Sequence, residues 1–332
     1  MPQVATVLAC LDRWGALRVR LGFGRMRYTV EPGLYGVGAP HEDSPVLVTA
    51  NYKLSFDHLR IALDGHHAWV LVLDTNGINV WCAAGKGTFG TAALCAQVAA
   101  NRLAQLVRHR RLVVPQLGAS GIAAHAVKKQ SGFSVVYGPV MARDIPEFLV
   151  HGMQASPAMR RKTFSLSERA VLVPVELVIA MKWALPLSVL LYGASGLFGD
   201  GAFWENVREH GGWTVAGLWV GIGAGTVLTP LLLPVLPGRA FSLKGGAAGV
   251  MAALVFLAVF FSRAEASGNT LTGLAWLLLI PAIASFLGLE FTGASTYTSL
   301  SGVKKEMRFA VPVQIAAAVS GLLLLVLARR LY

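Results

Sequence analysis

Cysteine is scarce in this 332-residue sequence, and its few copies stand far apart. Cys10, Cys82 and Cys95 form no C-x-x-C pair of the kind that ligates zinc or an iron–sulfur cluster. In a reducing compartment, three such residues also provide no disulfide framework. We therefore expect no iron–sulfur ligands in this chain, and any cysteine chemistry would depend on a single residue.

Acidic residues are also few, with 17 Asp and Glu against 29 Lys and Arg, and none stands between Asp74 and Asp144. This gap argues against dinucleotide binding, although GKGTFG at 85–90 matches the G-x-G-x-x-G pattern. A dinucleotide site needs its glycines directly after a strand, and an acid about 20 residues later for the ribose. Here the expected strand ends near Asp74. A P-loop is excluded because Gly87, and not Ser or Thr, follows Lys86.

An export signal and a nucleic-acid-binding module are not recognisable either. The first residues, MPQVATVLACLDRWG, contain an early acid and no cleavable apolar core, so we expect the amino-terminal part to stay in the cytoplasm. The basic cluster at 108–111 belongs to no nucleic-acid motif. Because anionic lipid headgroups attract Lys and Arg, the net charge of +12 indicates a membrane lipid surface, and we expect no nucleic-acid partner.

Long hydrophobic runs are abundant, and they are confined to the second half of the chain. Hydrophobic residues make up 55% of the sequence and the mean hydropathy is +0.57, whereas soluble domains contain about 45–50% apolar residues. Five runs approach the ~20 residues that a helix needs to cross a bilayer. They lie near 170–192, 213–236, 245–261, 271–291 and 309–327.

Lysine and arginine in the loops predict the orientation of these runs, because cytoplasmic loops are enriched in both residues. They gather before the first run, between the second and third, and between the fourth and fifth, at positions 160–162, 169, 239, 244, 304, 305 and 308. We therefore expect a multi-pass protein of the cytoplasmic membrane. Its amino-terminal domain would be cytoplasmic, and its carboxyl terminus would lie on the opposite side.

Strand and helix patterns alternate between residues 44 and 150. Short β-branched and apolar runs, SPVLVTANY, HAWVLVLDT, RLVVPQ and FSVVYGP, are typical of buried strands. Helical spacing marks SFDHLRIALDG, TAALCAQVAANRLAQLVRHR and GIAAHAVKKQ. This succession predicts a Rossmann-like α/β domain with a parallel sheet. The expected organisation is an arm of uncertain fold at 1–43, the α/β domain at 44–150, an amphipathic and basic linker at 151–169, and an all-α transmembrane domain of five helices at 170–332.

Cys82 lies in the glycine-rich segment NVWCAAGKGTFGT, at 79–91, ahead of a helix that we expect to begin near Thr88. Backbone amides at a helix start and the nearby Lys86 favour an anion, so the expected form is a thiolate. Small residues around the cysteine would let a large flat ligand approach the backbone. An inert cysteine in a tightly packed loop would explain the same residues. Local chemistry leaves both interpretations open.

The segment at 79–91 closely resembles the cap-helix motif of the membrane-bound corrinoid protein family of microbial mercury methylation. Three further segments, at 44–57, 113–149 and 291–307, are similar to the same family. The resemblance implies a corrinoid-binding Rossmann-like domain, related to the corrinoid iron–sulfur protein of acetyl-CoA synthesis, followed by five membrane spans. It also implies a corrinoid cofactor, cobalamin or a related cobamide, in its base-off form.

The resemblance also implies roles for individual residues. Cys82 would be the catalytic residue and the lower axial ligand of cobalt, bound as a thiolate. The other cofactor contacts that it implies are Thr49, Asn51, Asn79, Val80, Trp81, Ala83, Gly85, Lys86, Thr88, Gln116, Leu117, Gly118, Ala119, Gly121, His125, Tyr137, Gly138, Pro139, Val140 and Ala142.

The implied reaction is corrinoid-dependent methyl transfer from cobalt to mercury(II), giving methylmercury. Because mercury(II) is an electrophile, the methyl group must leave cobalt with electron density, as a carbanion equivalent or a radical. Among side chains, a thiolate is the softest anionic donor for the opposite face of the metal. The implied partners are a methyl-donor protein and a ferredoxin-like protein with two 4Fe–4S clusters, which would donate electrons and carry mercury.

Two other functions are open alternatives. A corrinoid methyl carrier of one-carbon metabolism would use the same cofactor and another acceptor, but the axial cysteine argues against it because those relatives lack such a thiolate. A membrane transporter or receptor with a nucleotide-sensing domain would need the fingerprint that 85–90 does not provide.

Overall fold

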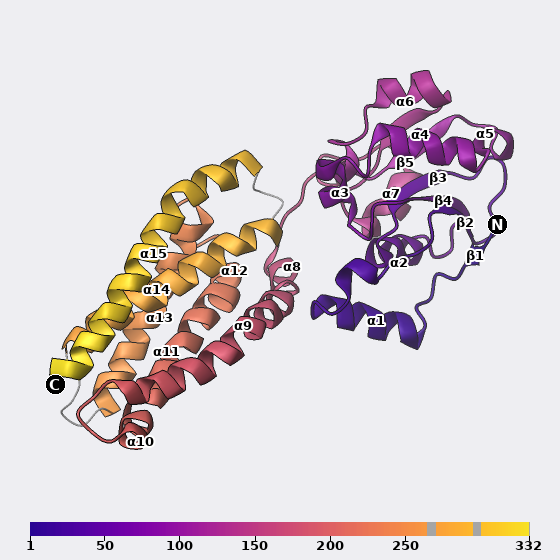
Figure 1. Cartoon of the computed structure of the whole chain (residues 1–332). Helices are drawn as coiled ribbons and strands as arrows, with labels where there is room; N and C mark the ends of the chain where they lie inside the picture. The colour runs from indigo at the N-terminus through magenta and orange to yellow at the C-terminus, as the bar shows by residue number, and fades with distance from the viewer. Residues whose placement is uncertain (264–269, 295–299, 332) are drawn as a thin grey trace. The chain divides into compact units, whose positions relative to one another are not determined.

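The computed structural model describes residues 1–263, 270–294 and 300–331. They belong to two compact units, Met1–Thr163 and Phe164–Tyr332 (Figure 1). Residues 295–299, which are part of the family-like segment at 291–307, lie outside the described residues, so the structure bears on that segment only at its two ends.

A six-stranded sheet with the order β1-β2-β4-β3-β5-β6 forms the centre of the amino-terminal unit. Strands β3, β4, β5 and β6 run parallel to one another, β2 pairs antiparallel with β4, and β1 pairs parallel with β2. The four strands expected between 44 and 150 are therefore confirmed as a parallel set within a mixed sheet. The strands are β1 Gln3–Val4, β2 Gly33–Val37, β3 Val46–Ala50, β4 Ala68–Leu73, β5 Arg111–Val114 and β6 Ser134–Tyr137.

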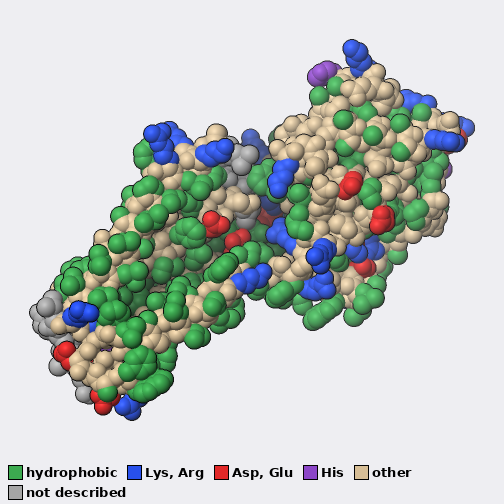
Figure 2. All heavy atoms as spheres, in the orientation of Figure 1, with side chains coloured by type: hydrophobic (Ala, Val, Ile, Leu, Met, Phe, Trp, Pro, Cys, Tyr) green, Lys and Arg blue, Asp and Glu red, His purple; other side chains and the backbone are tan. Residues whose placement is uncertain are grey.

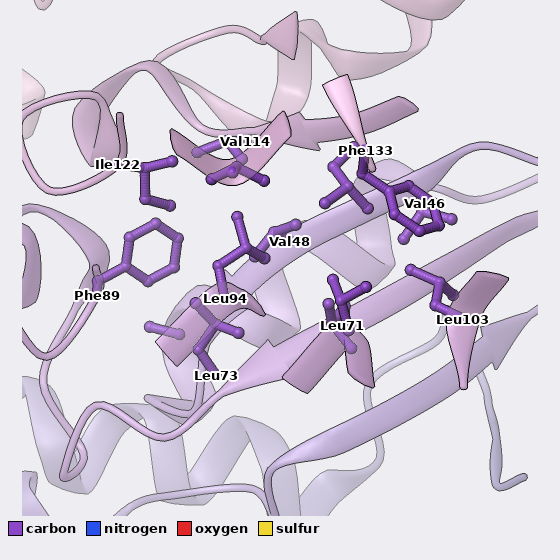
Figure 3. Packing of buried hydrophobic residues seen from close by; sticks show 14 of the residues in the cluster. Val46, Val48, Leu71, Leu73, Phe89, Leu94, Leu103, Val114, Ile122 and Phe133 are labelled. Atoms are coloured by element: carbon purple, nitrogen blue, oxygen red, sulfur yellow. The ribbon is translucent and has the colours of Figure 1, made fainter. Parts of the chain in front are cut away.

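Helices cover both faces of this sheet, which is why its central strands are continuously apolar. Every residue of β4 is buried, and its side chains alternate between two cores: Leu71 contributes to one and Val72 to the other. Helices α4 and α6 pack on the first core, where Phe89 and Ile122 also lie together (Figure 3), and helices α2 and α7 pack on the second. The helices are α2 Lys53–Ala62, α3 Val80–Lys86, α4 Thr91–Ala100, α5 Leu103–Leu106, α6 Ala124–Ser131 and α7 Ile145–Val150.

Two helical boundaries differ from the expectation. The segment that includes Cys82 forms a separate short helix, α3, and the next helix begins at Thr91 instead of near Thr88. The long helix expected after it is divided into α4 and α5, because Arg102 adopts a left-handed conformation with φ of +46°. Hydrophobic periodicity continues across this break, so the sequence pattern does not reveal it.

Residues 1–43 contain strands β1 and β2, helix α1 (Cys10–Arg20) and a short 3-10 turn, η1 (Arg25–Arg27). The two strands extend the sheet beyond β4, so this segment belongs to the same compact unit as the rest of Met1–Thr163.

A cluster of four charged side chains ties α1 to α2. Asp12 pairs with Lys53 and with Arg60 at 2.7 Å each, and Asp57 pairs with the same two cations at 2.9 and 2.7 Å. Arg60 also donates to the carbonyl oxygens of Ala5 and Val7. Burial acts to raise the pKa of the Asp12 carboxyl, but the hydrogen bonds donated by Lys53 and Arg60 outweigh burial and lower this pKa to about 2.

The described residues of the carboxy-terminal unit include five helical segments long and apolar enough to cross a membrane, Leu166–Leu197, Phe203–Leu232, Phe241–Ser262, Thr270–Gly293 and Ser301–Arg330. Each overlaps one of the five hydrophobic runs. Hydrophobic side chains cover the visible face of this unit (Figure 2), and Trp183 and Val189 are 78% and 76% exposed. The segments are built from α8 Leu166–Ala170, α9 Val173–Ala194, α10 Phe203–Asn206, α11 Gly212–Gly223, α12 Thr229–Leu232, α13 Phe241–Arg263, α14 Thr270–Glu290 and α15 Leu300–Leu331, with π-helical turns at Val207–Gly211 and Ala224–Leu228.

Small residues bring α13 and α14 close together. A side chain at Gly249 would meet the Cα of Pro281 at 2.6 Å, and one at Gly245 would overlap the backbone of Ala284. Close helix contact through small residues is typical of membrane bundles, where apolar surface alone does not drive association.

The lowered pKa of Asp12 predicts how stability depends on pH. A carboxylate whose pKa is depressed on folding stabilises the protein above its unfolded value, and this contribution is lost as pH falls through the folded value. For the full chain in detergent, we expect the parent to lose stability between about pH 4 and about pH 2. Asp12→Asn should cost about 1–3 kcal/mol at neutral pH and should lack that part of the pH dependence.

Thermal unfolding followed by circular dichroism at several pH values tests this expectation. Asp43→Asn, at an exposed position, is the matched control. Identical pH profiles for the parent and the Asp12 variant would contradict the assignment.

Candidate functional site

The carboxyl ends of the four parallel strands lie along one edge of the sheet. The chain leaves β3 for β4 on one side and then crosses to β5 on the other side of β3, so the connection reverses direction between β3 and β5. Ligands of open α/β sheets bind outside the carboxyl ends of the strands at such a point. Asn51 follows β3 there, and Gln116 follows β5. The topology therefore brings together segments that the sequence predicts to form one site.

Asn51 joins the end of β3 to the loop that follows β4. Its side chain is 6% exposed, and its Nδ2 donates to Asp74 Oδ1 at 2.9 Å. Its Oδ1 accepts from the backbone N–H groups of Thr75 and Gly77, at 3.1 Å each, and from the Thr75 hydroxyl at 2.8 Å. One amide therefore binds polar groups of Asp74, Thr75 and Gly77 in this loop. Asn51, which the sequence predicts as a cofactor contact, holds this loop in place through its side-chain amide.

The same loop leads directly to Cys82. Gly77 has a φ of +71°, and a side chain there would meet the carbonyl oxygen of Met26, so this turn requires glycine. Asn79 then caps α3 by accepting a hydrogen bond from the backbone N–H of Cys82 at 2.9 Å. Cys82 is the third residue of α3, and Lys86, four residues later, shares its helix face.

Helix α3 presents two different faces. Val80, Ala83 and Ala84 are buried in the core, whereas Trp81 and Cys82 are half-buried and Gly85 is exposed. A side chain added at Gly85 would have no neighbour within 4 Å, and the same holds at Gly87. The Cys82 thiol makes no hydrogen bond to the part of the chain that the structure describes. The outward face of α3 therefore combines an accessible sulfur with open space beside it.

Glycines in the loop between β5 and α6 hold α3 from the other side. A side chain at Gly118 would meet the Phe89 ring at 2.5 Å, and one at Gly121 would overlap the carbonyl oxygen of Phe89 and lie 3.0 Å from the Cα of Ala84. The loop begins with a 3-10 turn, η2 (Gln116–Gly118). Gly118 and Gly121, both expected as cofactor contacts, thus allow the close packing that positions α3.

The remaining predicted site residues differ in how deeply they are buried. Thr49 is buried in β3, and Tyr137 donates its hydroxyl to the Ile122 carbonyl at 2.7 Å. His125 is exposed on α6. Trp81, Thr88, Leu117, Ala119, Val140 and Ala142 are half-buried, Gly138 and Pro139 are buried, and Lys86 is exposed.

Three residues at this edge were not anticipated from the sequence. Thr75 is fully buried within the loop after β4, and Gly77, two residues later, makes the turn. The Asn-Gly pair at 76–77 is a turn signal that was available in the sequence. Arg160 stands 44 residues after Gln116 in the chain and donates a hydrogen bond to its Oε1 at 2.8 Å. No local sequence pattern indicates this contact.

A conventional metal centre is not formed by these residues. Within residues 1–263, 270–294 and 300–331, no group of three or more His, Cys, Asp or Glu side chains is placed to hold a metal ion. A metal bound at Cys82 would have this sulfur as its protein ligand and would bring its other ligands with it.

Comparison with known proteins finds similarity in the amino-terminal unit. Residues 23–149 match the family model of the CO dehydrogenase/acetyl-CoA synthase delta subunit. The acetyl-CoA decarbonylase/synthase complex subunit gamma of Methanopyrus kandleri is 35% identical over 122 residues, which are 36% of this chain and 26% of that protein. The corresponding subunit of Archaeoglobus fulgidus is 32% identical over 113 residues, 33% of this chain and 24% of that protein.

The corrinoid/iron-sulfur protein large subunit of Moorella thermoacetica is 29% identical over 121 residues, covering 36% of this chain and 27% of that protein. The chain thus spans about a quarter of the length of the curated relatives that it matches. The matched residues 23–149 include strands β2 to β6 and the Cys82 helix. This part of the chain is therefore related to the corrinoid protein subunits of the acetyl-CoA pathway.

Proposed function

We propose that this chain is a membrane-embedded, corrinoid-dependent methyltransferase that transfers a methyl group from cobalt to mercury(II), with Cys82 as the lower axial ligand of cobalt. The observation that carries the proposal is the outward face of α3, where an accessible thiol lies beside the open space at Gly85. The relation of residues 23–149 to corrinoid protein subunits supports the choice of cofactor.

The residues present fit a corrinoid. Its macrocycle supplies four nitrogen ligands to cobalt, so a single protein ligand completes one axial position, and Cys82 provides one sulfur. When bound, a methylated corrinoid supplies the methyl group that is transferred. Asn79 and Asn51 hold the cysteine in place through the α3 cap and the loop before it. The absence of a side chain at Gly85 leaves room for a flat ring near the sulfur.

The thiolate explains the choice of acceptor. A mercury(II) ion takes the methyl group together with electron density, and a soft anionic donor beneath cobalt favours its departure in that form. The resemblance of residues 79–91 to the mercury-methylation family supports mercury as the substrate. In this proposal the α/β domain has a Rossmann-like fold, and a ferredoxin-like protein with two 4Fe–4S clusters supplies electrons and carries mercury. A separate methyl-donor protein reloads cobalt.

The proposal places the five apolar helical segments across the cytoplasmic membrane, with the amino-terminal unit in the cytoplasm. Basic residues before the first segment and at the segment ends that would face the cytoplasm support this orientation; those at 169, 244, 304, 305 and 308 lie within the helices, and those at 160–162 and 239 lie outside them. Two basic residues near the carboxyl terminus, Arg329 and Arg330, would then lie on the opposite side.

A second candidate function keeps the corrinoid and changes the acceptor. One group of relatives is named for acetyl-CoA decarbonylase/synthase and another relative for a corrinoid/iron-sulfur protein, which favours a methyl carrier of one-carbon metabolism. A nucleotide-sensing receptor finds less support, because GKGTFG spans the end of α3 and the turn before α4 and does not directly follow β4.

Replacement of Cys82 tests the axial ligand. We expect Cys82→Ala to reduce methylation of mercury(II) to background and to change the visible spectrum of the bound corrinoid, because the cobalt–sulfur bond is lost. Cys82→His, which offers a neutral nitrogen donor, should also be inactive. Cys95→Ala, at a half-buried position on α4, is the matched control and should keep the parent spectrum and activity.

The assay uses the purified full chain loaded with methylcobalamin and freed of unbound corrinoid, so that the methyl group on the bound cofactor is the one transferred to mercury(II). Methylation of mercury(II) by Cys82→Ala at the parent rate would refute the axial thiolate. Corrinoid binding with a cysteine-dependent spectrum, but methyl transfer only to an acceptor other than mercury(II), would favour the second candidate.

Two glycine-to-alanine substitutions distinguish an effect on corrinoid binding from an effect on folding stability. Gly85→Ala places its methyl group in open space on a helix, so thermal stability should stay the same or rise by up to about 1 kcal/mol. The same methyl group should weaken corrinoid binding, because it occupies open space on the helix face that Cys82 shares. Gly121→Ala should destabilise the chain by about 1–3 kcal/mol, because it overlaps the Phe89 carbonyl.

Thermal unfolding and titration with cobalamin, followed by visible absorption, measure the two effects. Parent affinity in Gly85→Ala would show that the ring does not approach this face of α3.

A further inference from the structure

Helix α1 exposes a row of large apolar side chains. Leu11, Trp14 and Leu17 are 83%, 66% and 48% exposed, and Cys10 on the same face is also exposed. The loop and turn on either side of α1 continue this surface. We call the set the α1 patch; it consists of Val7, Cys10, Leu11, Trp14, Leu17, Phe23 and Met26. In Figure 2, hydrophobic side chains gather beside Lys and Arg side chains at the lower edge of the amino-terminal unit, where Figure 1 places α1.

The outward direction of the patch is enforced by the opposite face of the helix. Val19 is 1% exposed, and a side chain at Gly15 would meet the Tyr28 ring at 2.7 Å, so α1 lies directly on that ring. Asp12, on the same inward face, holds the ion pairs with Lys53 and Arg60. The spacing of residues 12, 15 and 19 defines one helical face. Leu11, Trp14 and Leu17 cannot turn inward without breaking these contacts.

The exposed charged side chains of α1 and η1 are basic, while the exposed Asp64 accepts a hydrogen bond from Thr6, next to Val7. Arg13 and Arg18 are exposed on α1, and Arg25 and Arg27 are exposed on η1. The only acid among the first 30 residues is Asp12, which is paired on the inward face. A helix with an exposed tryptophan and leucines flanked by arginines is the composition of helices that lie in the interface of an anionic membrane.

The amino-terminal unit is joined to the membrane-capable segments by a short connection. The amino-terminal unit ends at Thr163, and the first membrane-capable segment begins at Leu166, so the unit is tethered at the membrane in the proposed topology. Tethering raises the effective concentration of the second contact and lets a small surface bind. The tether and the charge pattern together favour lipid over a soluble partner.

We propose that the α1 patch docks the amino-terminal unit on the anionic bilayer that holds the carboxy-terminal segments. The inference rests on the membrane embedment in the proposed function, and not on corrinoid or mercury chemistry. The docked surface adjoins the candidate site, because the Met26 carbonyl lies against Gly77 in the loop that leads to Cys82. Contact with lipid would therefore restrain the segment that positions the cysteine.

The test uses the full chain in nanodiscs of phosphatidylcholine with phosphatidylglycerol. A nitroxide label is attached to Cys10 in a Cys82→Ser, Cys95→Ser background. A matched label at position 125, made by His125→Cys with Cys10→Ser in the same background, reports an exposed site on α6. Electron paramagnetic resonance then compares the collision of each label with oxygen, which partitions into lipid, and with a water-soluble nickel complex. Co-elution of the chain with the nanodisc scaffold checks embedment separately.

We expect the label at Cys10 to collide more with oxygen than with nickel, and the label at position 125 to show the reverse. In nanodiscs of phosphatidylcholine alone the difference should shrink. Arg13→Gln should lower the ratio of docked to undocked unit about fivefold, since each basic residue near an anionic surface contributes about that factor. Lys129→Gln, the same charge change on α6, should leave the ratio unchanged.

Equal nickel accessibility at the two labels would overturn the proposal. Shielding of Cys10 from both reagents would also overturn it, because that result indicates a protein contact in place of lipid.

Discussion

The amide of Asn51 is the contact on which the candidate site depends. It ends β3, and it accepts hydrogen bonds from the backbone of Thr75 and Gly77 in the loop after β4. That loop delivers Asn79, whose side chain caps α3 at the backbone N–H of Cys82. The cysteine is thereby fixed to the sheet through one amide and one helix cap. Buried amides of this kind are costly to disrupt, because each lost partner leaves a polar group without a hydrogen bond.

This arrangement divides the small residues around the cysteine into two groups. Ala83 and Ala84 are buried, Gly118 lies against the Phe89 ring, and Gly121 lies against the backbone of Phe89 and Ala84. Gly85 differs, because a side chain added there would have no neighbour within 4 Å. A packed interior accounts for the first group and leaves the second unexplained, which is why the open side of α3 carries the corrinoid proposal. Cys82 and Cys95 are both half-buried, so it is the position of Cys82 on the open face of α3 that distinguishes it.

Apolar surface also has two roles in this chain. Helical segments of the carboxy-terminal unit expose residues such as Trp183 and Val189, which suits lipid contact along whole spans. Helix α1 exposes a smaller set, held outward by the ion pairs of Asp12 and bordered by arginines. The first composition suits the hydrocarbon core and the second its charged surface. With α1 docked as proposed, one chain would contact both the hydrocarbon core and the charged surface of the same bilayer.

The amino-acid sequence alone determined the local features of this protein. Apolar β-branched runs specify β3 to β6, long hydrophobic runs specify five membrane-capable segments, and the 79–91 motif singles out Cys82, because each signal depends on neighbours within one element. Tertiary structure decided what depends on distant contacts. The pairing of β2 with β4 and the hydrogen bonds from the loop before α3 to Asn51 join residues that are far apart in the chain. The contacts that separate packed glycines from open ones do so as well. No local periodicity encodes such contacts, since they form only when distant segments come together in the folded chain.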